Sequence, residues 1–144
     1  MSWLTDQLNL NEIYRVVQRF YDKARKDSDI GHFFLRIKDF SEHEKKITAF
    51  WWLALGGSSD ALPDGTPSID MTTKHIALGI KEKDLHKWLV LFNQTLNEEL
   101  KKDLADAWKI KLDGIASHLK ALAIDGKSGG LQIKEPATKT NIKD

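Results

Sequence analysis

The sequence contains no cysteine in its 144 residues. That absence excludes disulfide bonds, catalytic thiolates, and zinc or iron–sulfur sites that use cysteine ligands. No apolar run approaches the roughly 20 residues that a membrane-spanning helix needs, so we expect no membrane contact. The first residues lack the basic start and the apolar block of a signal peptide, and we therefore expect a cytoplasmic protein.

An excess of one charge and the common catalytic motifs are also missing. Lysine and arginine number 22 against 21 acids, so the net charge of +1 gives no reason to expect nucleic-acid binding. The chain lacks a His-Glu-x-x-His metal motif, a Gly-x-Ser-x-Gly nucleophile motif and a glycine-rich phosphate loop. Aromatic residues, in contrast, are plentiful, with five Trp and six Phe. They predict a bulky aromatic interior, either a dense core or the lining of a cavity.

Helical periodicity runs through most of the chain and predicts an all-α fold with four main helices. Ser41 and Glu44 match a capping box, which places the start of the second helix at Ser41. The other expected helix starts are Asn9 or Asn11, Asp84, and Asp103.

One domain is expected from the length of the chain. Residues 56–68 are rich in turn-forming residues and predict a long loop between the second and third helices. We assign residues 1–125 to the folded domain and residues 126–144 to a polar tail that we expect to be disordered.

Four residues that are candidates for a functional site lie on apolar helical faces or beside apolar neighbours: Tyr21, His43, His75 and Trp88. Taken singly, Tyr21 and Trp88 fit an aromatic core, and His43 fits a residue at the core boundary. His75 is harder to explain in this way, because its neighbours are apolar and no acid is close in sequence. Its ring can ligate a metal through one nitrogen while the other binds a carbonyl, or it can interact with a helix C-terminus.

Taken together, two histidines in different surroundings, a tyrosine and a tryptophan suit a haem site. One histidine would bind iron from one side, and hydrogen-bond donors on the other side would surround a diatomic ligand. The apolar macrocycle would need a lining of Phe and Ile side chains, which this sequence can supply.

Several segments follow one another in an order and spacing that resembles the group III truncated haemoglobins, over residues 9–123. The segments are Phe20-Tyr21, Gly31-His32-Phe33-Phe34, His43 with Phe50-Trp51, Lys74-His75-Ile76, Trp88, and Ile115-Ala116-Ser117-His118. The resemblance implies a 2-on-2 truncated globin fold, a helical sandwich that encloses haem. Gly56-Gly57, directly after the second helix, departs from the family pattern.

The same resemblance implies a role for each matching residue. His75 would be the axial ligand of the iron in haem b. The Tyr21 hydroxyl and the Trp88 indole N–H would donate hydrogen bonds to a bound ligand. His43 would be a third distal group that acts as a donor, a gate or a competing sixth ligand. The other cofactor contacts implied are Phe34, Ile47, Phe50 and Phe92 along the apolar faces, with Phe33 as the alternative to Phe34, and Lys46 at a propionate.

The implied function is reversible binding of O2, CO and NO, which extends to NO detoxification if bound O2 oxidises NO to nitrate. We expect a monomer, with a reductase as the protein partner to consider. Two alternatives stay open at this point. One is a haem-based peroxidase or reductase in which His43 or Tyr21 assists O–O cleavage. The other is a helical interaction module without haem, in which the aromatic residues form an ordinary core.

Overall fold

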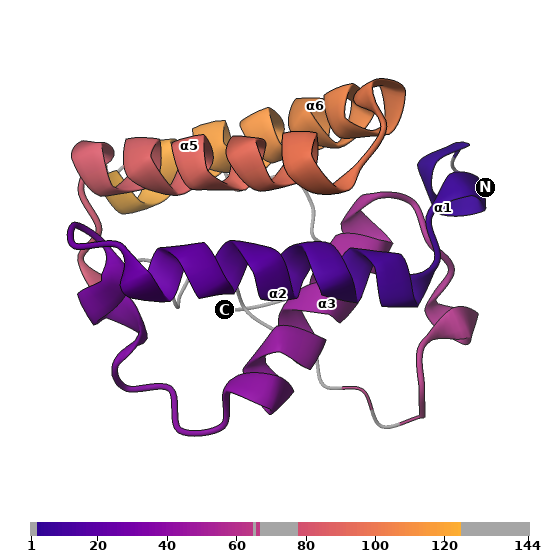
Figure 1. Ribbon diagram of the computed structural model, residues 1–144, viewed down its shortest axis with the longest axis horizontal. Helices are drawn as coiled ribbons and strands as arrows, with labels where there is room; N and C mark the ends of the chain where they lie inside the picture. The colour runs from indigo at the N-terminus through magenta and orange to yellow at the C-terminus, as the bar shows by residue number, and fades with distance from the viewer. Residues whose placement is uncertain (1–2, 65, 67–77, 125–144) are drawn as a thin grey trace.

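The computed structural model describes residues 3–64, 66 and 78–124, and every regular element in these ranges is helical (Figure 1). The elements are α1 (Trp3–Gln7), α2 (Leu10–Lys26), η1 (Gly31–Phe34), α3 (Phe40–Ala54), η2 (Ser59–Ala61), α5 (Glu82–Glu99), α6 (Lys102–Leu119) and η3 (Lys120–Ile124). The all-α prediction is confirmed, and α2, α3, α5 and α6 correspond to the four predicted helices. Within the described ranges, no helix is both long enough and apolar enough to cross a membrane.

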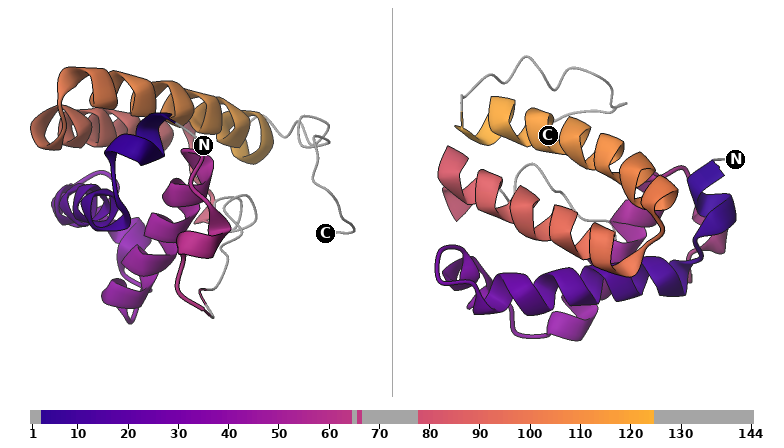
Figure 2. Two further views of the ribbon diagram at one scale, coloured as in Figure 1. Left: turned by 90° about the vertical axis from the view of Figure 1, so that its right-hand side faces the viewer. Right: turned by 45° about the horizontal axis from the view of Figure 1, so that its top comes forward.

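The main helices form two pairs that lie against each other. Helix α2 packs on both α3 and α5, and α5 packs on α6. Figure 1 shows α5 and α6 side by side above α2, while α3 crosses behind α2 from below. The turned views in Figure 2 agree with this arrangement. The α2/α3 pair and the α5/α6 pair therefore make a two-on-two helical sandwich.

The centre of the sandwich is a contact among four aromatic side chains, one from each main helix. Phe92 of α5 lies 4.7 Å from Phe20 of α2 and 5.4 Å from Trp51 of α3, measured between ring centroids. Trp108 of α6 lies 5.5 Å from Trp51. None of the four is more than 2% exposed. Because each such pair adds about 1 kcal/mol beyond the burial of its area, this cluster fixes how the two layers meet.

One polar atom inside this cluster has no hydrogen-bond partner among the residues that the structure describes. The indole nitrogen of Trp108 is buried and makes no hydrogen bond within the described part of the chain. A buried donor of this kind costs about 1–3 kcal/mol. The aromatic packing around Trp108 must offset that cost.

The helix starts show which capping predictions hold. Asn9 caps α2: its side chain accepts from the Glu12 N–H at 2.9 Å, and the Glu12 carboxylate accepts from the Asn9 N–H at 3.0 Å. The predicted start of α3 at Ser41 is wrong, because Asp39 is the cap and accepts from the Glu42 N–H at 3.1 Å. Glu44 cannot close a capping box with Ser41, since it lies a full turn into the helix and is buried.

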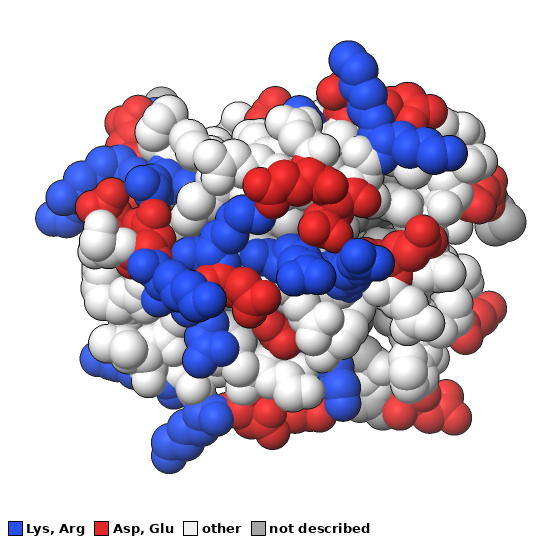
Figure 3. All heavy atoms as spheres, in the orientation of Figure 1, with Lys and Arg blue, Asp and Glu red and all other residues white. Residues whose placement is uncertain are grey.

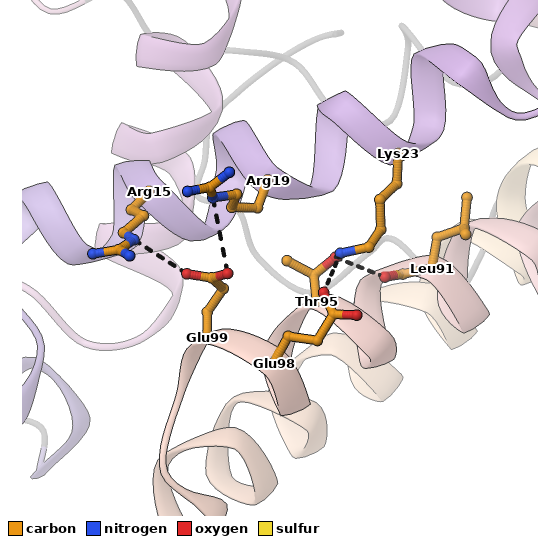
Figure 4. A network of polar contacts seen from close by, with 7 residues as sticks. All are labelled: Arg15, Arg19, Lys23, Leu91, Thr95, Glu98 and Glu99. Carbon is orange, nitrogen blue, oxygen red and sulfur yellow. Dashed lines mark hydrogen bonds and ion pairs between the residues drawn. The ribbon is translucent and has the colours of Figure 1, made fainter.

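A network of charged side chains joins α2 to α5 at the surface. Acidic and basic residues intermingle over these helices in Figure 3, and Figure 4 shows the contacts from close by. Arg15 and Arg19 lie 3.1 Å and 3.8 Å from the Glu99 carboxylate, and Lys23 pairs with Glu98. Lys23 also reaches the Thr95 hydroxyl at 3.4 Å. Exposed pairs contribute little singly, but this row fixes which turns of α2 and α5 face each other.

Gly56 and Gly57, which depart from the family pattern, follow the end of α3, where the chain passes close to Trp52. Gly56 has a φ of +100°, a conformation that side chains disfavour. A Cβ added to Gly57 would lie 2.2 Å from the Trp52 ring. The Trp52 indole N–H donates to the Ser58 carbonyl at 2.8 Å. The two glycines therefore let the chain fold back onto Trp52.

The position of the α3 cap gives a test by substitution. Asp39→Ala should lower the free energy of unfolding by about 1 kcal/mol, because the Glu42 N–H loses its acceptor. The matched control is Ser41→Ala, which changes an exposed residue outside the cap and should cost less than about 0.5 kcal/mol. Urea unfolding of the two variants measures both values. If Ser41→Ala lowered the free energy of unfolding more than Asp39→Ala did, Ser41 would be the cap of α3, as the sequence predicted.

Candidate functional site

A hydrogen bond between Tyr21 and His43 lies at the centre of the candidate site. The Tyr21 hydroxyl oxygen on α2 is 3.1 Å from His43 Nε2 on α3. Helical spacing explains why the two side chains meet, because each lies on the face of its helix that packs against the other helix. Tyr21 is 7% exposed, so its hydroxyl needs the partner that His43 provides. The structure thus brings together two residues that the sequence placed in one distal group.

Aromatic rings surround the Tyr21 side chain. Phe34 of η1 and Phe40 at the start of α3 each lie 5.5 Å from the Tyr21 ring, in edge-to-face orientations. The His43 ring lies 5.3 Å from Tyr21 and 5.7 Å from Phe40. These contacts fix the direction of the phenol ring, so the hydroxyl has a defined position in an apolar environment.

An apolar cavity of about 60 Å³ adjoins Tyr21. Its walls come from α2, η1, the start of α5 and the end of α6, and all but two lining residues are aliphatic or phenylalanine or tryptophan. The lining consists of Tyr21, Ile30, Phe33, Phe34, Leu78, Ile80, Asp84, Leu85, Trp88 and Leu119. The Asp84 carboxylate accepts from the Lys81 N–H at 2.9 Å and so supports the start of α5.

Lys87, the residue before Trp88, joins α5 to the loop before η1 through two ion pairs. Lys87 Nζ lies 3.3 Å from Asp27 and 3.6 Å from Asp29, in the loop that leads to η1. Asp27 in turn accepts from the backbone N–H groups of Asp29 and Ile30. The first half of α5 is therefore tied to the segment that carries Phe34, and both Trp88 and Phe34 line the cavity.

The other predicted haem contacts occupy different surroundings. Ile47 is buried in the core, and Phe50 is half-buried, 5.4 Å from Trp51. Phe92 lies in the aromatic cluster between the layers and not among the cavity residues. Lys46 lines a separate hollow between α2, α3 and the segment after η2. The roles predicted for these four residues stay predictions.

His75, the predicted metal ligand, lies outside the described residues. Leu78, three positions later in the sequence, lines the cavity beside Trp88. Within the described ranges, no three His, Asp or Glu side chains gather as a metal site would require. The iron ligand that the sequence predicts is His75, and its placement stays a prediction.

Sequence reasoning missed Phe40, which contacts Tyr21, Phe34 and His43. A signal was present, because residues three apart on a helix share a face and Phe40 precedes His43 by three. Starting the helix at Ser41 left Phe40 outside it. An α3 start at Asp39 would have placed Phe40 beside His43.

Burial and charge both act on the Tyr21 hydroxyl. Burial raises the pKa of Tyr21 above its usual value, and the negative charge of Glu44 raises this pKa further. Burial also raises the pKa of Glu44, as does the Asp22 carboxylate, while Arg25 opposes the change. The phenol therefore stays protonated, and its hydrogen remains present for a hydrogen bond.

The raised Tyr21 pKa predicts a loss of stability in alkali. Above the usual tyrosine pKa of about 10 the unfolded chain loses this proton while the native chain keeps it, so the free energy of unfolding falls with rising pH. From about pH 9 to about pH 11, the fall should exceed that of Tyr21→Phe by about 1 kcal/mol. Urea unfolding at both pH values measures it, and equal falls would contradict the raised pKa.

Comparison with known proteins agrees with this geometry. The family model "Bacterial-like globin" matches residues 6–120. The group 3 truncated hemoglobin ctb of Campylobacter jejuni is 29% identical over 119 residues, which cover 78% of this chain and 89% of that protein. The crystal structure of group III truncated hemoglobin from Campylobacter jejuni has a TM-score of 0.69 at 27% identity, over 85% of this chain and 95% of that one. The 2-on-2 globin fold expected from the resemblance is confirmed, and the chain belongs to the bacterial-like globin family.

Proposed function

We propose that this globin holds haem b through His75 and binds O2, CO and NO on the side of the haem where Tyr21 lies. Membership of a globin family implies haem binding, which favours this function over the helical module without haem. The observation that carries the proposal is the buried Tyr21 hydroxyl, paired with His43 beside an apolar cavity. Haem would supply the iron to which a diatomic ligand binds.

The chemistry of the cavity walls suits haem. Phe33, Phe34, Leu85 and Trp88 present carbon surface, as a macrocycle requires, and the Tyr21 hydroxyl supplies a donor. The enclosed volume of about 60 Å³ is smaller than a porphyrin. Binding haem therefore requires these walls to move apart, and the apolar surface that opens would be covered again by the macrocycle.

The proton on His43 decides what Tyr21 can do. The hydroxyl has one hydrogen, and the distance of 3.1 Å to Nε2 fits a bond in either direction. If Nε2 carries the proton, it donates to the Tyr21 oxygen, and the hydroxyl hydrogen is released toward the cavity. In the other tautomer the hydroxyl donates to His43 and offers the cavity only lone pairs. We propose that His43 is protonated at Nε2 and orients Tyr21 as the donor.

A hydrogen-bond donor in an apolar cavity should slow the release of a polar ligand. Bound O2 carries partial negative charge on its outer atom, and a hydrogen bond to charge is stronger where water is excluded. Trp88 lines the same cavity, and its indole can supply a second donor. NO detoxification needs O2 to remain bound until NO arrives, so slow release is the property that would permit this reaction.

The haem ligand can be tested by absorption spectroscopy after reconstitution with haem. The native chain should show a Soret band, and His75→Ala should lose it or shift it to that of weakly held haem, because iron loses its axial nitrogen. His86→Ala, which removes an exposed histidine from α5, is the matched control and should leave the band unchanged. An unaltered five-coordinate spectrum in His75→Ala would refute the assignment.

The donor role of Tyr21 can be tested by the rate of O2 release. Tyr21→Phe should speed O2 dissociation tenfold or more, since a hydrogen bond to a charged group is worth about 1.5–3 kcal/mol. Tyr14→Phe removes a hydroxyl from the hollow that Lys46 lines, away from the cavity, and should leave the rate unchanged. Stopped-flow displacement of O2 by CO measures both rates. Equal rates in the native chain and Tyr21→Phe would remove Tyr21 from the distal group.

A further inference from the structure

A surface hollow of about 470 Å³ lies on the outer side of Phe34. It is formed by the end of α2, by η1 and by the turn that leads to α3. The lining residues are Asp22, Arg25, Lys26, Gly31, Phe34, Leu35 and Ile37. Phe34 lines this hollow and also the interior cavity beside Tyr21. Phe34 is therefore shared by the surface hollow and the candidate haem site.

Two cations line the hollow, and two more lie in the turn beside it. Arg25 and Lys26 line it, and Arg36 and Lys38 lie in the exposed turn that follows Leu35. No ion pair joins any of these four to an acid within the described ranges. In Figure 3, blue side chains project from the lower left, where Figure 1 places the turn between η1 and α3.

The acids close to the hollow offset this charge only in part. Asp22 lines the hollow and is exposed. The Asp39 carboxylate is held by the N-terminus of α3 through the Glu42 N–H, and Glu44 is buried. An approaching molecule therefore meets the four cations with Asp22 as the exposed acid of the lining.

An exposed apolar side chain also lines this hollow. Leu35 is 82% exposed, which is more than any other exposed large apolar residue that the structure describes. Ile37 is half-buried beside it. Transient protein interfaces combine a small apolar centre with a charged rim, and here the cations would form that rim.

We propose that this hollow is the docking surface for an acidic protein that carries single electrons to the haem. The inference rests on the proposed function, because without haem the partner would have no acceptor. In each transfer the partner loses one electron and is oxidised, and the iron gains it and passes from ferric to ferrous. The acidic surface of the carrier meets Arg25, Lys26, Arg36 and Lys38, and Leu35 enters the contact.

Two features favour an electron carrier as the occupant. The first is proximity, since Phe34 lines both the hollow and the candidate haem cavity. The second is the size and charge of the surface. Complexes of redox proteins bury little area, below about 1,200 Å², and depend on complementary charge for fast encounter. A hollow with Arg25, Lys26, Arg36 and Lys38 in or beside its lining and one exposed leucine matches that pattern.

Arg25 also connects the hollow to the distal residues. Its guanidinium lies over the Phe40 ring, 3.8 Å from the ring centroid. Phe40 contacts both Tyr21 and His43. The stacking holds the Arg25 side chain in one position, which lowers the entropy lost when a carboxylate of the partner pairs with it.

The test is binding of oxidised flavodoxin, an acidic one-electron carrier, to the haem-reconstituted full chain at low salt. Calorimetry measures the dissociation constant without any electron transfer. Lys26→Glu/Lys38→Glu should raise this constant at least tenfold, and added salt should weaken native binding. Lys101→Glu/Lys111→Glu makes the same change in net charge at α6 and should leave the constant within twofold.

A second pair of variants tests the apolar contact. Leu35→Ser should weaken flavodoxin binding at least threefold, whereas Ile110→Ser should not, although Ile110 on α6 is also 74% exposed. Thermal melting confirms that all variants fold. Absence of binding by the native chain, or equal effects of the site and control variants, would overturn the docking surface while the Soret band stays normal. A missing Soret band would instead overturn the proposed function.

Discussion

The fold depends on the contact among Phe20, Trp51, Phe92 and Trp108, because each of the four main helices contributes one ring to it. Because the four rings pack at one shared centre, a shift of any of the four helices would disturb the packing of the others. The cluster joins Phe20 of α2 to Trp51 of α3 through Phe92, and the same two helices carry the Tyr21–His43 hydrogen bond. The buried N–H of Trp108, which has no hydrogen-bond partner among the described residues, lies in the same cluster.

Much of the fold could be predicted from the sequence because helices record their buried face in local spacing. Asn9 and the four main helices follow from such local patterns. The start of α3 could not be chosen from pattern alone, because Asp39 and Ser41 are both good caps and only the three-dimensional path of the chain decides between them. The packing of Phe92 between the layers could not be predicted for a related reason: a helical stripe shows that a side chain faces inward, not what it meets.

Part of the candidate site could also be predicted from the sequence, and part of it could not. Tyr21, Phe34 and Trp88 could be named from the order of motifs, and the structure places all three at one cavity. The hydrogen bond between Tyr21 and His43 joins residues 22 positions apart, and no local pattern encodes such a distance. The surface hollow was also invisible in the sequence. Arg25 and Lys26 lie on α2, while Arg36 and Lys38 lie beyond η1. Only the fold shows that all four lie in or beside the lining of one hollow.

The close approach of Gly57 to Trp52 has a consequence for the path of the chain. The Trp52 indole lies against the Gly57 backbone and is hydrogen-bonded to the Ser58 carbonyl, so it acts as a template that sets the direction in which the chain leaves α3. Leu62 and Pro63, which follow this exit, form one wall of the hollow that Lys46 lines. A methyl group at position 57 would overlap the indole, so the ring or the backbone of this turn would have to shift. The direction of the chain after α3 thus depends on position 57 having no side chain.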